Sequence, residues 1–261
     1  MTLEAESPDP FFEKTESALR ALFDLARQKN ELHFALALMP EMRGLQDAGW
    51  CTATEAQRAF DEYMSFIDTT RGIIRFRIAL AFYCHAAEAS GFYEVPKNML
   101  RIAGGEGHVL WPFMNLVESH RLTGDRIAPN ANKVLKDLAG HAETVGLHAL
   151  AEVFRDAFDS DIRNGYAHAD YVIWEDGLRL RKRNGGQPKV VPWDKFTALF
   201  NRGINLFHIL RQLVSEYMKS YQEPRTIRAK LNNEPEGDWT IYCEANGAFG
   251  ITSGKYERKT T

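Results

Sequence analysis

Apolar residues recur at intervals of three and four positions from about Phe11 to His168, with few strand-like alternations. This spacing places apolar side chains on one face of an α-helix, whereas a half-buried strand alternates every second residue. A chain that keeps the helical period over more than half of its length has to build its core by packing helices on helices. We therefore expect a mainly α fold.

Four helices are expected before Ser90. Proline does not continue a helix, so the second should end near Pro40. Thr52 or Thr54 is available to cap the third, and Gly91 should end the fourth. The apolar positions that mark these helices span Leu19–Ala26, Leu32–Met39, Thr54–Ile67 and Ile73–Ala89.

A stretch rich in glycine and proline, between Pro96 and Asn132, predicts short helices and loops. Asn130–Thr144 and Gly146–Asn164 then return to the helical period and predict a helical hairpin. The second of these carries one apolar stripe, formed by Leu147, Leu150, Phe154, Phe158 and Ile162. The residues just after the stripe should therefore lie at the C-terminal end of a core helix.

The hydrophobic period changes to two after His168. Strands are expected at 171–174 and 178–181 around the turn Glu175-Asp176-Gly177, and a further strand at 190–191. A helix should span Trp193–Tyr221, and a second hairpin should follow at 239–243 and 249–252. We expect a helical extension (1–70), a helical domain (71–222) with an inserted β-hairpin (171–191), and a tail (223–261) with a small β appendage.

The charge balance does not by itself indicate nucleic acid. Lys and Arg number 32 against 35 Asp and Glu, a formal net charge of −3, so a local patch would have to meet any anionic partner. Cys51, Cys84 and Cys243 are too widely separated for a disulfide framework or a cysteine zinc site. The acidic N-terminus lacks signal-peptide features, and Ile73–Phe92 is too polar to span a bilayer. We expect a cytoplasmic protein without membrane partner, metal or other cofactor.

An Arg-Asn pair, Arg163 and Asn164, precedes His168 between the expected core helix and the expected hairpin. The spacing between Arg163 and His168 does not by itself identify a site, because other Arg and His residues have a similar spacing. It also occurs at Arg27/His33, Arg101/His108 and Arg202/His208. The adjacent Asn, the amphipathic helix before the motif and the strands after it distinguish this occurrence.

This context resembles the signature of the HEPN family, small all-helical domains many of which are metal-independent endoribonucleases. The resemblance covers only the motif and its flanks. It implies an HEPN-like helical bundle, catalytic roles for Arg163, Asn164 and His168, RNA as substrate, and a homodimer with both motifs facing one cleft. It also implies a toxin or antiviral defence setting, with a cognate inhibitor or companion chain. Some HEPN toxins silenced by a nucleotidyltransferase carry Tyr two residues after the motif His, where this chain has Asp170.

The motif residues suit RNA cleavage by the ribose 2′-hydroxyl. An imidazole titrates near pH ~6.5, so His168 can accept or donate the proton. Arg163 can bind two phosphate oxygens with a permanent charge, and Asn164 can orient the phosphate or the hydroxyl. On an ideal helix Arg163 and His168 would point about 140° apart. Either the backbone bends at Gly165 or a second copy completes the site.

A basic segment follows the motif. Arg179, Arg181, Lys182 and Arg183 lie in a span without acidic residues, and strand alternation sends Arg179 and Arg181 to one face. This strip is a candidate RNA-binding surface. Charged faces of hairpins are also commonly exposed to solvent without binding a partner, so this alternative stays open.

Structural roles are open for the motif as well. Arg163 can pair with Asp156 or Asp159 at the helix end, and His168 can bond a carbonyl group in a turn. The alternative to a ribonuclease is therefore a catalytically silent HEPN-fold module that binds a protein or nucleotide partner and uses the motif at its dimer interface. Elsewhere, His141 is expected to be an ordinary surface residue.

Overall fold

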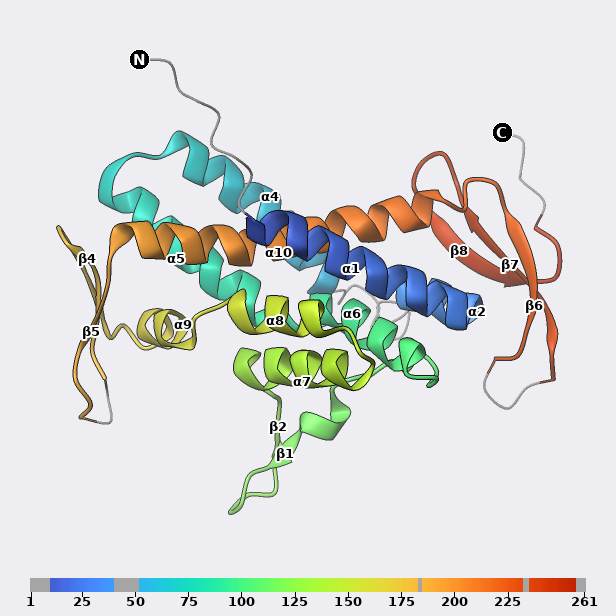
Figure 1. The fold of residues 1–261 in the computed structure, drawn as a ribbon, viewed down its shortest axis with the longest axis horizontal. Helices are drawn as coiled ribbons and strands as arrows, with labels where there is room; N and C mark the ends of the chain where they lie inside the picture. The colour runs from blue at the N-terminus through green and yellow to red at the C-terminus, as the bar shows by residue number, and fades with distance from the viewer. Residues whose placement is uncertain (1–9, 40–51, 183–184, 232–234, 257–261) are drawn as a thin grey trace.

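The computed structural model describes residues 10–39, 52–182, 185–231 and 235–256. Helices dominate this part of the chain, as the apolar period predicted (Figure 1). The α-helices are α1 (Pro10–Lys29), α2 (Glu31–Ala37), α4 (Thr52–Thr69), α5 (Gly72–Glu88), α6 (Ser90–Ala103), α7 (Ala131–Thr144), α8 (His148–Asp156), α9 (Ser160–Ala167) and α10 (Trp193–Lys219). None of these helices is both long and apolar enough to cross a membrane.

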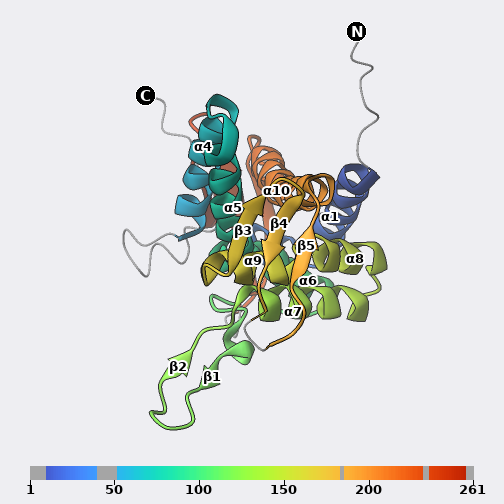
Figure 2. The same ribbon diagram turned by 90° about the vertical axis from the view of Figure 1, so that its left-hand side faces the viewer.

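Small antiparallel sheets lie at the periphery of the helices (Figure 1). The strands are β1 (Glu118–Ser119), β2 (Arg126–Ile127), β3 (Tyr171–Trp174), β4 (Gly177–Leu180), β5 (Lys189–Val191), β6 (Arg225–Ala229), β7 (Gly237–Cys243) and β8 (Phe249–Ser253). The sheet β3-β4-β5 lies at the N-terminal end of α10, in front of α5 and α9 in Figure 2, and β6-β7-β8 lies at the other end. The expected hairpin after the motif helix is therefore present.

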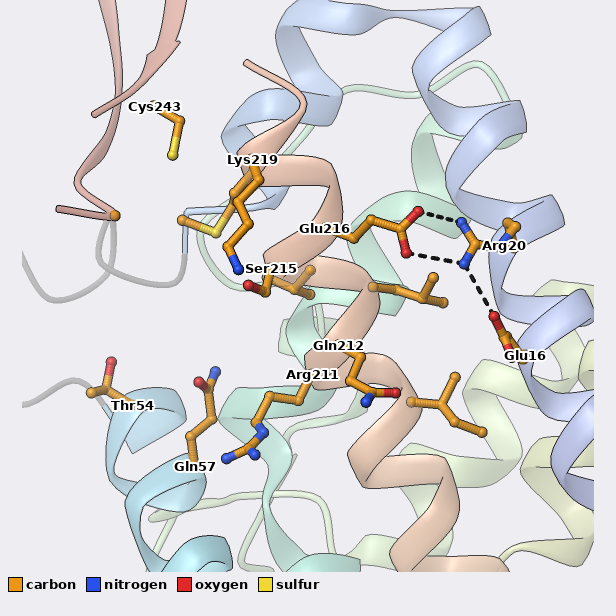
Figure 3. A pocket seen from close by; sticks show the side chains of 15 residues that line it. Glu16, Arg20, Thr54, Gln57, Arg211, Gln212, Ser215, Glu216, Lys219 and Cys243 are labelled. Atoms are coloured by element: carbon orange, nitrogen blue, oxygen red, sulfur yellow. Dashed lines mark hydrogen bonds and ion pairs between the residues drawn. The ribbon is translucent and has the colours of Figure 1, made fainter. Parts of the chain in front are cut away.

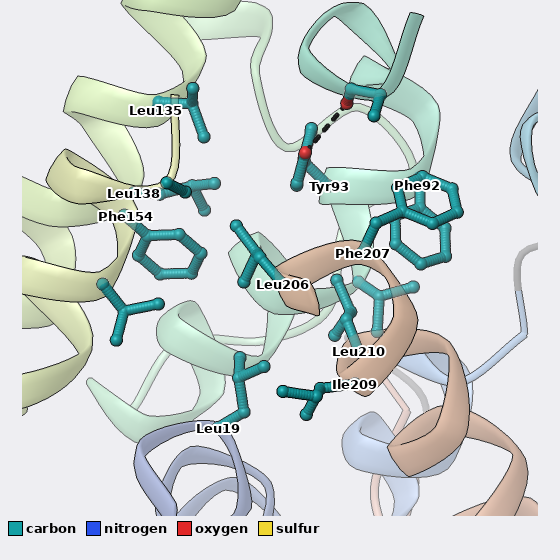
Figure 4. Close-up of a cluster of buried hydrophobic side chains, with 14 of the residues drawn as sticks. Leu19, Phe92, Tyr93, Leu135, Leu138, Phe154, Leu206, Phe207, Ile209 and Leu210 are labelled. Carbon is teal, nitrogen blue, oxygen red and sulfur yellow. Dashed lines mark hydrogen bonds between the residues drawn. The ribbon is translucent and has the colours of Figure 1, made fainter. Parts of the chain in front are cut away.

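The core gathers around α10. Its buried face meets apolar side chains from α1, α6, α7 and α8, and Phe92 stacks on Phe207 with ring centroids 4.0 Å apart (Figure 4). The hydroxyl of the fully buried Tyr93 donates to the carbonyl oxygen of Ala86 at 2.9 Å, so this polar group is satisfied inside the core. Helices from both sides of residue 70 share this core. The division of the chain at that position stays a prediction.

The predicted end of the fourth helix is present, because α5 ends at Glu88 with Ala89 as its C-cap. A new helix, α6, then starts at Ser90 and runs to Ala103, past Pro96, where the sequence predicted short helices and loops. Gly91 lets α6 approach α4, because an added Cβ would collide with the Thr52 hydroxyl. Pro96 lies inside α6. The apolar side chains that α6 buries on both sides of Pro96, including Phe92 and Met99, offset the missing backbone hydrogen bond.

The single helix expected at Gly146–Asn164 is two helices, α8 and α9. Asp159 interrupts it: its Oδ1 accepts hydrogen bonds from the backbone N–H groups of Asp161 and Ile162, at 2.7 and 3.2 Å. A capping carboxylate favours a new helix start over continuation of the old helix. The motif therefore lies on a separate short helix and not at the C-terminal end of a long one.

The C-terminal appendage has three strands in place of the expected hairpin. The two predicted strands are present as β7 and β8, and β6 pairs with β7 in antiparallel register, with Ile227 opposite Trp239. The sequence of β6, Arg-Thr-Ile-Arg-Ala, is mostly exposed and offers little apolar alternation. Its pairing with β7 could not be predicted from its own pattern.

Gly165 lies inside α9 and does not bend it. The helix continues to Ala167, and Gly165 is buried against β4. An added Cβ would lie 2.7 Å from Cδ2 of Leu180, which is itself 2% exposed. The missing side chain thus lets the motif helix sit directly on the hairpin. The proposed bend at Gly165 is wrong.

We expect Gly165→Ala to lower the free energy of unfolding by about 1–3 kcal/mol, because the new methyl group overpacks the contact with Leu180. Gly140→Ala in α7 is the matched control, since its Cβ would meet no atom within 4 Å. That variant should be more stable than the parent by about 0.5–1 kcal/mol. Urea unfolding followed by circular dichroism measures both, and equal stability of the two variants would contradict the close packing of α9 on β4.

Candidate functional site

Asp159 fixes the start of the motif helix α9. Besides capping the helix through its carboxylate, its backbone N–H donates to the hydroxyl of Tyr83 on α5 at 2.6 Å. Tyr83 is fully buried, and its burial raises the pKa of the phenol well above the ordinary value, so the hydroxyl stays protonated. The turn between α8 and α9 is therefore anchored to the core.

Two carboxylates of this turn bind the lysines of the hairpin. Asp161 accepts from Lys182 at 2.5 Å and from Lys189 at 3.0 Å, and Asp159 accepts from Lys189 at 2.9 Å. The hydrogen bonds from Lys182 and then Lys189 lower the pKa of the Asp161 carboxyl. The end of β4 and the start of β5 are thus both tied to the first turn of α9.

A groove of about 330 Å³ opens beside α9 and contains two of the three predicted catalytic residues. Asn164 is partly buried, and His168 is exposed at the C-cap of the helix. The groove is lined by Asp161, Asn164, Gly165, His168, Asp170, Leu180, Arg181 and Lys182. The fold therefore brings an amide, an imidazole and two basic side chains of the hairpin to one solvent-accessible hollow.

Arg163 is not among the residues that line this groove. Its side chain is 12% exposed and lies against α5, where Nη1 is 2.8 Å from Oε1 of Glu88. Within the described residues, its buried Nε has no hydrogen-bond partner. The partner is Glu88, not Asp156 or Asp159. Arg163 and His168 therefore point in different directions from α9, as expected for an ideal helix. One protomer does not bring the two side chains together in a single site.

The three predicted RNA-binding cations that the structure describes are each held by a carboxylate. Arg181 is 2.9 Å from the buried Asp170, and Lys182 binds Asp161 as described above. Arg179 pairs with Asp176 at 2.9 Å and lies over the ring of Trp174, outside the groove. Arg183, the fourth predicted cation, lies outside the described residues. The hairpin is therefore less electropositive than its sequence suggests.

Sequence reasoning named Asp159 only as a possible partner of Arg163 and missed its role as the cap of α9. That role could have been found, because an Asp two to three residues before an apolar position is a common helix start. Glu88 carried no such signal, since its contact with Arg163 joins segments far apart in the chain. Asp170 is 8% exposed and holds Arg181.

A larger hollow, of about 860 Å³, runs along α10 away from the motif. Figure 3 shows that the guanidinium group of Arg20 donates to both carboxylate oxygens of Glu216 and also to Glu16. Arg211, on the opposite side, pairs with Asp61 at 2.7 Å. These charges already neutralise one another, and we assign this hollow no chemistry.

Comparison with known proteins gives no family for the chain. No family model matches it, and neither a curated protein nor a solved structure is significantly similar to it. The resemblance to the HEPN signature therefore rests on residues 163–168 and their flanks alone. In the described part of the chain, no group of three or more His, Cys, Asp or Glu side chains is placed to hold a metal ion.

The Asp161 carboxylate should make stability depend on pH. Because its folded-state pKa lies below the ordinary value of 3.8, its stabilisation is present above that value and disappears as the pH falls through the folded-state pKa. Asp161→Asn should lower the free energy of unfolding by up to about 1 kcal/mol near pH 6, and by less near pH 3. Asp156→Asn, an exposed carboxylate of α8, is the control. Denaturant unfolding across this range tests the prediction, and a difference that does not narrow would refute it.

Proposed function

We propose that this protein is a metal-independent endoribonuclease that cleaves RNA by attack of the ribose 2′-hydroxyl. The observation that carries the proposal is the groove beside α9, in which Asn164 and His168 face the hairpin residues Arg181 and Lys182. An imidazole for proton transfer, an amide donor and cations for the phosphate are the groups that this reaction needs.

In this proposal the 2′-oxygen attacks the adjacent phosphorus and the 5′-oxygen of the next nucleotide leaves. His168 accepts the proton of the attacking hydroxyl or supplies one to the leaving oxygen. Asn164 orients the phosphate through its amide, and Lys182 and Arg181 compensate its charge once RNA displaces their carboxylate partners. The products are a 2′,3′-cyclic phosphate and a 5′-hydroxyl. RNA is the partner that this chemistry requires.

We further propose that the active form is a homodimer. In one protomer Arg163 and His168 diverge, so a second copy is needed for Arg163 of one chain to approach the groove of the other. The outer face of the sheet β3-β4-β5 offers a contact area beside the motif, because Val172, Trp174 and Val190 are each about half exposed. A toxin or antiviral role with a cognate inhibitor, in the cytoplasm, follows from the family resemblance alone.

The second candidate is a catalytically silent module that binds a protein or nucleotide partner. One observation favours it: Arg163, the residue expected to bind phosphate, is largely buried in an ion pair with Glu88. An ion pair that holds a largely buried guanidinium group is a sufficient structural reason for an arginine at that position. The two candidate functions differ in the role of Arg163. In the ribonuclease it takes part in catalysis, whereas in the silent module it only holds α9 against α5.

We expect the purified protein to cleave a structured RNA or a tRNA pool in excess EDTA and to leave 2′,3′-cyclic phosphate ends. His168→Ala should lower the rate at least 100-fold, because general acid–base catalysis contributes about that factor or more. His148→Ala, an exposed histidine at the start of α8, should cleave like the parent. Intact RNA with the parent protein, or equal cleavage by both variants, would leave the silent module as the better account.

A charge swap separates the two roles of Arg163. Arg163→Glu and Glu88→Arg should each destabilise the protein, and the double variant should recover most of the lost stability by re-forming the pair. If Arg163 is catalytic, the double variant remains inactive toward RNA, while Glu88→Gln keeps its activity. Urea unfolding and RNA cleavage are measured on the same preparations. Restored cleavage in the stable double variant would show that Arg163 has a structural role only.

A further inference from the structure

A second polar cavity, of about 590 Å³, lies between α6, α7 and the loop that follows α6, far from the motif helix in sequence. Its deep part holds Lys97, Arg101, Asp137 and His141, and its rim carries the exposed side chains of Trp111 and Met114. Its volume is in the range of sites for small organic ligands, which are about 300–1,000 Å³. The sequence analysis expected His141 to be an ordinary surface residue, but it is partly buried in this cavity.

Lys97 is unusually buried for a lysine, with a side chain only 6% exposed. Its Nζ lies 2.7 Å from Oδ2 of Asp137 and 3.0 Å from Nδ1 of His141. An ammonium group has three N–H donors. Among the described residues His141 lies at hydrogen-bonding distance, whereas Oδ2 of Asp137 forms an ion pair with Lys97 but no hydrogen bond. At least one N–H donor is therefore left for a group that enters the cavity.

His141 offers a second donor. Burial and the neighbouring Lys97 lower its pKa, so the ring is neutral near pH 7. Its Nδ1 faces an ammonium group, which can only donate, and must therefore be the unprotonated acceptor. The ring proton then resides on Nε2, for which the described residues provide no hydrogen-bond partner. Lys97 and His141 thus act as a paired donor site on one wall of the cavity.

Arg101 adds a cation whose counter-ion is replaceable. Its guanidinium donates to the carbonyl oxygen of Gly107 at 3.3 Å and lies 2.7 Å from the carboxylate of Glu106. The Arg101 side chain is 23% exposed, whereas that of Glu106 is 50% exposed and lies in the loop. An exposed ion pair contributes about 0–1 kcal/mol, so an incoming anion can take the place of Glu106 at little cost.

Gly140 provides a position from which the cavity can be filled. It lies in the interior of α7, where glycine costs about 0.5–1 kcal/mol relative to alanine. Nothing in the described fold requires it, because an added Cβ would meet no atom within 4 Å. Gly140 also lines the cavity. A larger side chain at this position would therefore extend into the open space of the cavity without meeting another part of the described fold.

We propose that this cavity binds a small organic anion, a carboxylate or a phosphate monoester, whose acidic group is held by Lys97, His141 and Arg101 and whose flat apolar body lies on Trp111. Asp137 compensates the buried ammonium group, which allows the ligand charge to be met by Arg101. The proposal is independent of RNA cleavage, since none of these residues lines the groove beside α9.

Isothermal titration of the full chain with benzoate and with phenyl phosphate tests the proposal, with benzyl alcohol as the uncharged control. At least one anion should bind with a dissociation constant at or below about 1 mM, and the alcohol should bind at least tenfold more weakly. The tighter of the two anions identifies the acidic group. Absence of binding by both anions up to about 10 mM, or equal binding of the alcohol, overturns the proposal.

Variants locate the bound probe. Gly140→Leu fills the cavity from an open helix position and should weaken binding at least tenfold, whereas Gly140→Ala should change it less than threefold. Lys97→Met should also weaken binding at least tenfold, and Lys136→Met, an exposed lysine on α7, should not. Glu106→Gln should tighten binding about threefold because it removes the competing carboxylate. Unchanged binding by Gly140→Leu rejects the site even if Lys97→Met does not fold.

Discussion

The arrangement of the molecule depends on the continuous packing of α10. This helix of 27 residues is about 40 Å long, and it buries apolar side chains along its whole length. Its N-terminal end supports the sheet β3-β4-β5, and its C-terminal end leads into β6-β7-β8 (Figure 1). Tyr217 donates to Asp24 of α1 at 2.5 Å, and Glu216 holds Arg20 of the same helix. The two peripheral sheets therefore take their positions from one rigid helix.

Polar contacts, in contrast, set the position of the motif helix. α9 has only eight residues, too few to be stable by itself, and buries little besides Ile162 and Gly165. Asp159 compensates by capping α9, by binding Tyr83 through its backbone and by pairing with Lys189. The same carboxylates that hold the helix also neutralise the nearby lysines. An anion that bound in the groove would therefore compete with the carboxylates that hold α9 in place.

Local rules predicted the elements whose signals are local. The helix expected at Asn130–Thr144 is present as α7, with Asn130 as its N-cap, and the predicted turn at Glu175 to Gly177 joins β3 to β4. These local rules failed where a contact between residues far apart in the sequence determines the structure. Pro96 predicts the end of a helix, and only the burial of α6 explains why the helix continues through it. The pairing of Glu88 with Arg163 depends on α5 lying beside α9, which the sequence does not show. The site residues were named from sequence, but which of them share a groove depends on the packing of Gly165 against Leu180.

The position of Arg163 determines what the motif can do. Its guanidinium is mostly buried, so loss of its anionic partner would leave a largely buried charge without compensation. Glu88 is 43% exposed and its other oxygen accepts from the N–H of Ala131 at 3.2 Å, so its hold on Arg163 is partial. A phosphodiester offers the same kind of oxygen acceptors as a carboxylate. Exchange of Glu88 for an RNA phosphate would keep the charge compensated, and this exchange is the step on which a catalytic role of Arg163 depends.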